Sequence, residues 1–123
     1  MTLKEVARIV EAKFLNLEDR ADEEVNTACA ADLLSDVLAM RGDASLLITG
    51  EAAPQVVRVA DVMNIKAILY VRGKRPQKED VIKWAADRGI VLLSTHLPTF
   101  EVCGRLYVAG IRCSEAPQGN ETR

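Results

Sequence analysis

The chain has 123 residues, of which 49% are hydrophobic and 28% charged, and its formal net charge is −2. This balance is typical of one globular domain and excludes the strongly basic surface that binds nucleic acids or anionic membranes. The aromatic share of 4% argues against a surface that stacks nucleobases. No apolar run approaches the ~20 residues that cross a bilayer. We therefore expect neither nucleic-acid nor membrane partners.

Cysteine usage bears on the compartment and on metal binding. Cys29, Cys103 and Cys113 form an odd set without a CxxC pair, whereas a small secreted protein would carry an even disulfide framework. Residues 1–5 already carry charge and lack the apolar core of a signal peptide. We expect a cytoplasmic protein. The cysteine spacing lacks the clustering of zinc sites, and we expect no metal and no cofactor.

The N-terminal part is predicted to begin with a helix. Thr2 and Glu5 have the spacing of a capping box, and residues 3–12 place apolar side chains on one helical face. Residues 13–17 are predicted to form a short strand. The charged run at residues 18–24 is interpreted as a solvated loop.

A strand and a second helix are expected next. Residues 25–30 are rich in small and β-tolerant side chains, and Asp32 is then either the N-cap or a first-turn acid of a helix. Gly42 is placed as the residue after that helix. The predicted buried stripe comprises Leu33, Leu34, Val37, Leu38 and Met40.

From Ser45 to Gly110 the chain repeats one unit three times. Each unit is an apolar run, a turn and a helical pattern, which predicts parallel strands joined by crossover helices. The runs are residues 45–49, 67–71 and 90–94, and the helical patterns end at Asn64, Arg88 and Ala109. The last helix is expected to supply Phe100, Val102, Cys103, Leu106, Tyr107 and Val108. The fold class is therefore single-domain, three-layer α/β with a largely parallel sheet. We place the domain at residues 1–111 and expect a disordered tail at residues 112–123.

The turns after these strands supply the candidate site. Ligands of open parallel sheets bind beyond the carboxyl ends of the strands, where the three turns would converge. We expect the ligand-binding residues to be Thr49, Gly50, Glu51, Arg72, Gly73, Lys74, Thr95 and His96. The cations of the second turn, with helix N-terminal amides, would suit an anion. Ordinary solvated turns are the alternative interpretation.

Catalysis has little support in the sequence. His96 is the single histidine, and such a residue is more often a cap or a surface residue than a general base. Ser94 lacks the GxSxG elbow, and neither a P-loop nor a GxGxxG motif is present. We expect no enzyme and no catalytic residue. A small enzyme that uses His96 and Lys74 is kept as an alternative.

Several segments together resemble the DRTGG domain family. They are residues 45–50, 71–76, 92–95 and 99–101, and the resemblance extends from Leu3 to about Ile111. It implies an α/β fold similar to the N-terminal domain of HPr kinase/phosphorylase and, more distantly, of Mur ligases. Family members occur in phosphotransacetylases and between CBS domains of some pyrophosphatases, and others are free-standing. They are regarded as regulatory or dimerisation domains.

The sequence departs from that family at its namesake positions. Glu51-Ala52-Ala53 stands where the Asp-Arg pair would follow the first strand, and Val71-Arg72-Gly73 stands where Thr-Gly-Gly would follow the second. The resemblance therefore implies the fold more strongly than the site.

The resemblance and the turns together favour a non-catalytic regulatory domain, expected to be a homodimer that senses a small anionic metabolite. The alternative that rests on the resemblance alone is an adaptor with a protein partner in hydrogenase or acetyl-phosphate metabolism.

Overall fold

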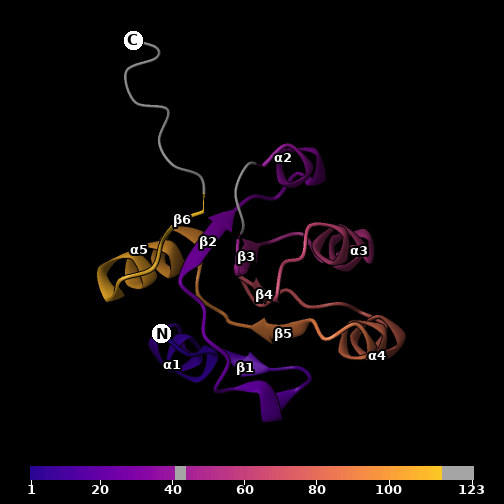
Figure 1. Cartoon of the computed structure of the whole chain (residues 1–123), viewed down its shortest axis with the longest axis horizontal. Helices are drawn as coiled ribbons and strands as arrows, with labels where there is room; N and C mark the ends of the chain where they lie inside the picture. Colours follow the sequence, from indigo (N-terminus) through magenta and orange to yellow (C-terminus); the bar gives the residue numbers. More distant parts are fainter. Residues whose placement is uncertain (41–43, 115–123) are drawn as a thin grey trace.

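The computed structural model describes residues 1–40 and 44–114, and its centre is a six-stranded sheet of order β1-β5-β4-β3-β2-β6 (Figure 1). β1 pairs with β5 in antiparallel orientation, and the other pairs are parallel. The strands are β1 (Lys13–Phe14), β2 (Thr27–Ala30), β3 (Leu46–Thr49), β4 (Ala67–Tyr70), β5 (Val91–Ser94) and β6 (Arg112–Cys113).

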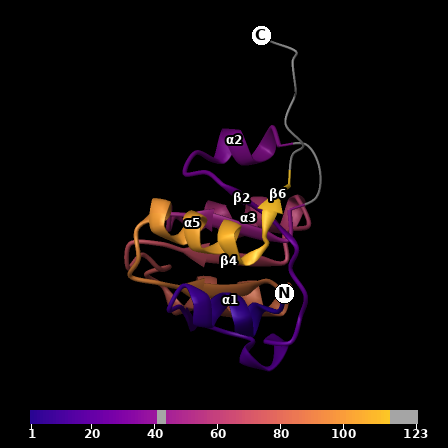
Figure 2. The ribbon, with the colours of Figure 1, turned by 90° about the vertical axis from the view of Figure 1, so that its left-hand side faces the viewer.

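Helices cover both faces of the sheet. One face carries α1 (Leu3–Ile9) and α5 (Thr99–Ala109), which lie side by side in front of the strands in Figure 2. The other carries α2 (Leu34–Leu38), α3 (Gln55–Val62) and α4 (Glu79–Asp87), while the 3₁₀ helix η1 (Glu18–Arg20) follows β1. The predicted three-layer α/β fold is thus confirmed. No helix within the described ranges is long and apolar enough to cross a bilayer.

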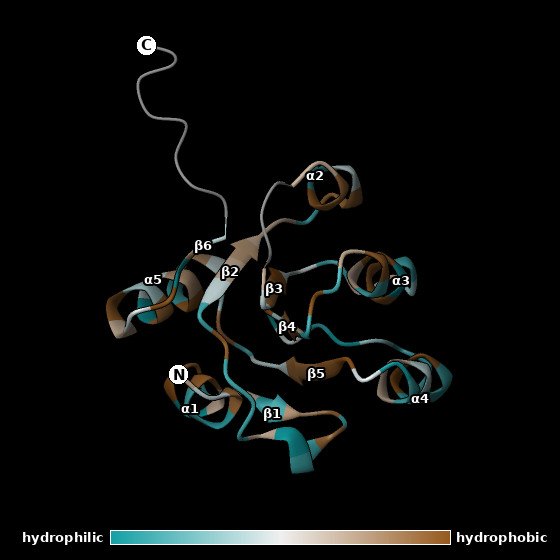
Figure 3. Ribbon diagram, viewed as in Figure 1, coloured by the Kyte–Doolittle hydropathy of each residue, from teal (hydrophilic) through white to brown (hydrophobic). Residues whose placement is uncertain are grey.

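Two hydrophobic clusters hold the layers together, one on each face of the sheet. Alternate residues of a strand point to opposite faces, so Leu46 and Ile48 belong to the cluster under α1 and α5, whereas Leu47 belongs to the other. Burial on both faces requires apolar side chains at successive positions, and β3 and β5 accordingly are hydrophobic in Figure 3. This explains why the three apolar runs were recognisable in the sequence.

The N-terminal helix begins as predicted. The Thr2 hydroxyl accepts the Glu5 backbone N–H at 3.2 Å, and the Glu5 carboxylate accepts the Thr2 N–H at 2.9 Å. This backbone hydrogen bond from Thr2 lowers the pKa of Glu5. α1 nevertheless ends at Ile9 rather than at residue 12, because the chain turns at Glu11, whose φ of 56° is left-handed.

The stripe predicted for the second helix is wrong in part. α2 begins at Leu34, and of its residues Val37 is buried. Leu33 and Leu38 are 63% and 53% exposed, because a five-residue helix can turn only one narrow face toward the sheet. The expectation for Gly42 lies outside the described residues.

Two further differences concern the end of the chain. Within α5, Val102 and Leu106 are buried, whereas Phe100, Tyr107 and Val108 lie on the outside. The fold also extends past residue 111, since β6 pairs with the edge of β2.

Asn16 joins β5 to α4 and to the segment after β1. Its side-chain amide donates to the carbonyls of Ile82 and Ile90, both at 3.2 Å, and its carbonyl accepts the Leu92 N–H at 2.8 Å. One side chain thereby forms hydrogen bonds with three backbone groups of α4, β5 and the residue that precedes β5.

We predict that Asn16→Ala lowers the free energy of unfolding by about 3 kcal/mol, because three partly buried backbone groups lose their partner. Asn26→Ala is the control: Asn26 is exposed, and the change should cost under about 0.5 kcal/mol. Urea unfolding measures both. Equal midpoints for the two variants would contradict this role of Asn16.

Candidate ligand-binding rim

The ends of β3, β4 and β5 lie next to one another at one edge of the sheet. Thr49 pairs with Tyr70, and Tyr70 pairs with Ser94, so the turns that follow these residues start at the same level. We call residues 49–51, 71–74 and 94–96 the rim. The expectation that the three turns share one edge is confirmed.

The turn after β3 is held by an acid from outside it. The Asp32 carboxylate accepts the Gly50 N–H at 2.8 Å and the Thr49 hydroxyl at 3.5 Å. Asp32 was predicted to be either the N-cap or a first-turn acid of α2, and it is neither, because the N-cap is Leu33 and the helix begins at Leu34. Glu51 folds over its own turn, with its carboxylate accepting the Ala53 N–H at 3.0 Å.

The turn after β4 is closed by two left-handed residues, Arg72 with φ of 56° and Gly73 with φ of 72°. The Lys74 N–H donates to the Val71 carbonyl at 3.0 Å, which gives a tight turn of the I′ kind. The Arg72 and Gly73 amides donate to the carbonyls of Leu97 and Thr95, at 2.9 and 2.8 Å. We call these two hydrogen bonds the clasp, because they tie the second turn to the third.

The Arg72 side chain connects all three turns. A Cβ added at Gly50 would overlap the Arg72 guanidinium, so the glycine allows that group to lie against the backbone of the first turn. The same guanidinium donates to the Thr99 hydroxyl at 3.3 Å, at the first residue of α5. Glycine at position 50 thus allows the Arg72 guanidinium to approach the backbone of the first turn closely.

A hollow of about 530 Å³ opens at the rim. Within the described ranges, Arg72 and Lys74 form no ion pair, whereas Arg75 lies 3.5 Å from Glu79. Two cations without carboxylate partners therefore adjoin the hollow and create a positive potential there. Its lining comprises Gly50, Glu51, Ala52, Arg72, Gly73, Lys74, Arg75 and Gln77.

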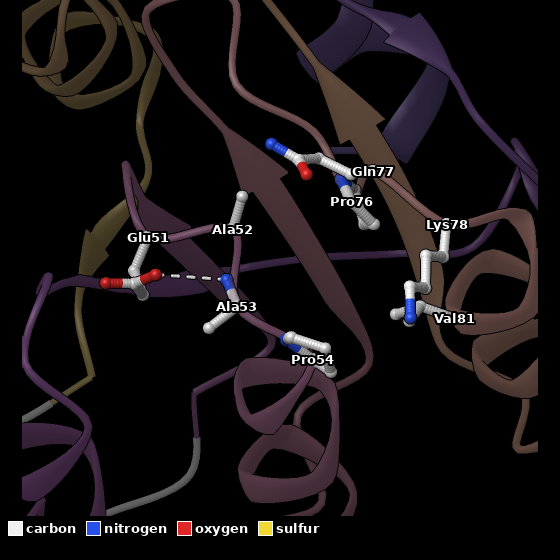
Figure 4. A pocket seen from close by; sticks show the side chains of 8 residues that line it. All are labelled: Glu51, Ala52, Ala53, Pro54, Pro76, Gln77, Lys78 and Val81. Atoms are coloured by element: carbon white, nitrogen blue, oxygen red, sulfur yellow. Dashed lines mark hydrogen bonds between the residues drawn. The ribbon is translucent and has the colours of Figure 1, made fainter.

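A second hollow of about 360 Å³ adjoins the first between the starts of α3 and α4. Figure 4 shows residues 51–54 on one side of it, and Pro76, Gln77, Lys78 and Val81 on the other. Neither helix has a side-chain cap at its N-terminus.

Three of the predicted site residues, Thr49, Thr95 and His96, do not line either hollow. Thr49 is 2% exposed, and its hydroxyl lies 3.5 Å from the Asp32 carboxylate. Thr95 is 2% exposed, and its hydroxyl donates to the Val10 carbonyl at 2.6 Å and accepts the Leu97 N–H at 3.2 Å. His96 is exposed and approaches Glu11, with 3.6 Å between Nε2 and the carboxylate. The alternative of an enzyme using His96 with Lys74 gains no support, because only Lys74 adjoins the rim hollow.

In the sequence, Tyr70 was not distinguished from the other residues of its predicted strand. Its side chain is fully buried, and its hydroxyl has no hydrogen-bond partner in the part of the chain that the structure describes. Burial raises the pKa of Tyr70 well above its ordinary value, so the phenol stays neutral.

The three cysteines meet in one place despite their spacing in sequence. Cys29, Cys103 and Cys113 all line an apolar hollow of about 190 Å³ between α5 and the β2–β6 edge. Burial raises the pKa of the Cys103 thiol. No group of three ligand residues suited to a metal ion occurs among residues 1–40 and 44–114.

Comparisons with known proteins place this geometry in a family. A family profile matches residues 5–109 to the DRTGG domain. The chain belongs to the DRTGG domain family, which is a family of regulatory domains. A search of curated protein sequences gave no match.

A solved structure with the same fold contains the CBS and DRTGG domains of the regulatory region of Clostridium perfringens pyrophosphatase. That structure is described as complexed with its activator, diadenosine tetraphosphate. The TM-score is 0.70 at 16% identity, a likeness that shows the fold alone. The match covers 96% of this chain and 51% of the solved chain, so this DRTGG chain spans about half the length of that one.

We predict that Thr95→Val lowers the free energy of unfolding by about 2 kcal/mol, since the Val10 carbonyl and the Leu97 amide lose a buried partner. His96→Ala, at the neighbouring exposed position, should change it by less than about 0.5 kcal/mol. Thermal and urea unfolding compare the two. A Thr95→Val protein as stable as the wild type would show that the hydroxyl has no structural role.

Proposed function

We propose that this DRTGG domain is a non-catalytic regulatory domain that binds a small phosphate-bearing anion at the rim and forms a homodimer through α5. The single observation that carries the ligand is the position of Arg72 and Lys74, two cations without carboxylate partners in the described structure, beside the rim hollow. Cations in such a concave site concentrate anions. The regulatory character of the family and the nucleotide activator of the pyrophosphatase region support a ligand of this kind.

The backbone of the rim supports the same ligand. The turn around Gly73 is fixed by the clasp before any ligand arrives, so little conformational entropy is lost on binding. The uncapped start of α3 adds the positive end of the helix dipole. Glu51 partly offsets this charge, and its carboxylate is available to hydroxyl groups of a ligand.

The outer surface of α5 supports the dimer. Phe100 and Val108 are each 89% exposed and lie four residues on either side of Gly104. A Cβ at Gly104 would meet no atom of the described residues within 4 Å, so no packing contact in that part of the chain requires glycine there. Glycine in a helix interior costs about 1 kcal/mol relative to alanine. Close packing of a second copy of the chain against α5 accounts for the glycine at position 104.

We call the row of Phe100, Gly104 and Val108 on the outer surface of α5 the stripe, and it is complementary to itself. A two-fold axis at Gly104 would place Phe100 of one copy against Val108 of its partner, and the reverse, as an isologous interface requires. Tyr107, which is 61% exposed, would extend the contact. Arg105 pairs with Glu101 and with Glu11 beside the stripe, and these charges form the polar margin common around apolar interfaces.

The compartment proposed for this domain is the cytoplasm, where cysteines stay reduced. The absence of a disulfide among Cys29, Cys103 and Cys113 is compatible with that compartment. No contact described above bears on the adaptor function, which stays a prediction.

The ligand is tested by isothermal titration calorimetry with pyrophosphate. Lys74→Glu should weaken binding about 10-fold or more, because it replaces attraction by repulsion at the rim. Lys83→Glu makes the same charge change at an exposed position of α4 that lines neither hollow, and it should leave binding within about twofold. No binding to the wild type, or equal losses in both variants, would contradict the rim site.

The dimer is tested by size-exclusion chromatography with light scattering. The wild type should have the mass of a dimer at micromolar concentration, and Phe100→Glu should be a monomer because a buried carboxylate opposes association. Val62→Glu is the control, since Val62 is 72% exposed on α3 in the opposite layer. A monomeric wild type, or a dimeric Phe100→Glu protein, would contradict the interface on α5.

A further inference from the structure

The rim hollow is followed by two more hollows beside α3 and α4, and neighbouring hollows share lining residues. The rim hollow shares Glu51, Ala52 and Gln77 with the hollow between the starts of α3 and α4. That second hollow shares Pro54 and Val81 with a third, of about 210 Å³, which is lined by Pro54, Arg58, Asp80, Val81 and Trp84. We call the three together the α3–α4 groove. It leads from the cations of the rim to the single tryptophan of the chain.

The chemistry of the groove changes along its length. Arg72 and Lys74 make the rim end cationic. The middle is lined mostly by alanine, proline and valine, with Lys78 and Glu51 as its charged members. At the far end an indole ring is 38% exposed and provides a flat apolar surface. The groove therefore suits a ligand that is anionic at one end and planar at the other.

Trp84 is held in place before a ligand arrives. The Arg88 guanidinium lies 5.3 Å from the centre of the indole ring, a cation–π contact. Asp61 of α3 in turn fixes Arg88 at 2.8 Å, and this hydrogen-bonded pair raises the pKa of the guanidinium. The ion pair spans α3 and α4 and so helps to fix the distance between the two walls. A ring that is already oriented loses little entropy when it stacks on a ligand.

Polar groups beside the groove suit the remaining parts of such a ligand. The Glu51 carboxylate lies where the rim hollow meets the second one, and it is able to accept hydrogen bonds from sugar hydroxyls. Arg58 and Asp80 share the third hollow with Trp84 and present a donor and an acceptor to the edge of a ring.

We propose that the α3–α4 groove binds a nucleoside phosphate, with its phosphates at Arg72 and Lys74 and its base against Trp84. The inference rests on the proposed anion site at the rim and adds to it the class of ligand and the residue that recognises the base. Lys78 in the middle hollow and Trp84 at the far end are six residues apart, or about 9 Å along α4. A ligand that reaches from Arg72 and Lys74 to Trp84 has to cover this stretch as well as the rim hollow. Inorganic phosphate or pyrophosphate would fill only the rim end.

The test compares ADP, pyrophosphate and adenosine on the full chain, using calorimetry and the fluorescence of Trp84. Stacking of a base should make ADP bind about 10-fold more tightly than pyrophosphate, and ADP should change the Trp84 fluorescence while pyrophosphate does not. Trp84→Leu should remove that gain for ADP and leave the pyrophosphate affinity within about twofold. Val62→Ala, at a 72% exposed position of α3 that lines none of the three hollows, is the control and should alter neither affinity.

The outcomes separate the two proposals. Pyrophosphate that binds as tightly as ADP, without a fluorescence change from ADP, would overturn the nucleoside phosphate and leave the anion site standing. ADP that binds while pyrophosphate does not, with a fluorescence change, would support the base site and contradict the cationic rim. Should Trp84→Leu fail to fold, the fluorescence of the wild-type chain still decides, because it needs no variant.

Discussion

The clasp between the second and third turns is the constraint on which the rest of the rim depends. The parallel register brings the strand ends to one level, and the Arg72 and Gly73 amides then fix the second turn against the carbonyls of Leu97 and Thr95. These bonds are made by backbone groups, so they hold the shape of the rim without prescribing its side chains. That separation explains how the chain keeps the DRTGG fold with Glu51-Ala52-Ala53 and Val71-Arg72-Gly73 at the namesake positions.

The Arg72 side chain gives the two proposed surfaces a common element. The rim and the α3–α4 groove lie beside α3 and α4, whereas the proposed dimer surface lies on α5 in the opposite layer (Figure 1). Arg72 touches both sides, because its guanidinium lies against Gly50 and donates to Thr99 at the start of α5. An anion that draws the guanidinium toward itself would compete with Thr99 for the same donors, so ligand binding and the position of α5 share one side chain.

The sequence predicted the fold well because burial on both faces of the sheet leaves a strong local signal. Leu46 to Thr49 and Val91 to Leu93 are continuous buried runs, and each is followed by a helical pattern. The rim was predictable for the same reason: strand ends in a parallel sheet must share an edge. Gly50, Arg72 and Lys74 accordingly lie together, as expected.

What the sequence did not reveal depends on side-chain direction and on distant partners. Thr49 and Thr95 both stand at strand ends, yet both are only 2% exposed. Thr49 donates to Asp32, and Thr95 donates to the Val10 carbonyl, which is 85 positions away in the sequence. Asp32 suited a helix cap locally, but the Gly50 amide competes for it. In α5, apolar residues occupy both faces, so periodicity could not tell which of Val102 and Val108 is buried. The meeting of three cysteines likewise depends on the pairing of β6 with β2.

The central claim, that the rim is an anion site held ready by the clasp, is tested most directly by nuclear magnetic resonance. Inorganic phosphate is titrated into ¹⁵N-labelled protein while the backbone amide signals are followed. The account predicts saturable shifts that are largest for Gly50, Gly73 and Lys74, with the signal of Gly104 on α5 unmoved at low phosphate. Shifts that are absent, that do not saturate, or that are largest away from these turns would contradict it.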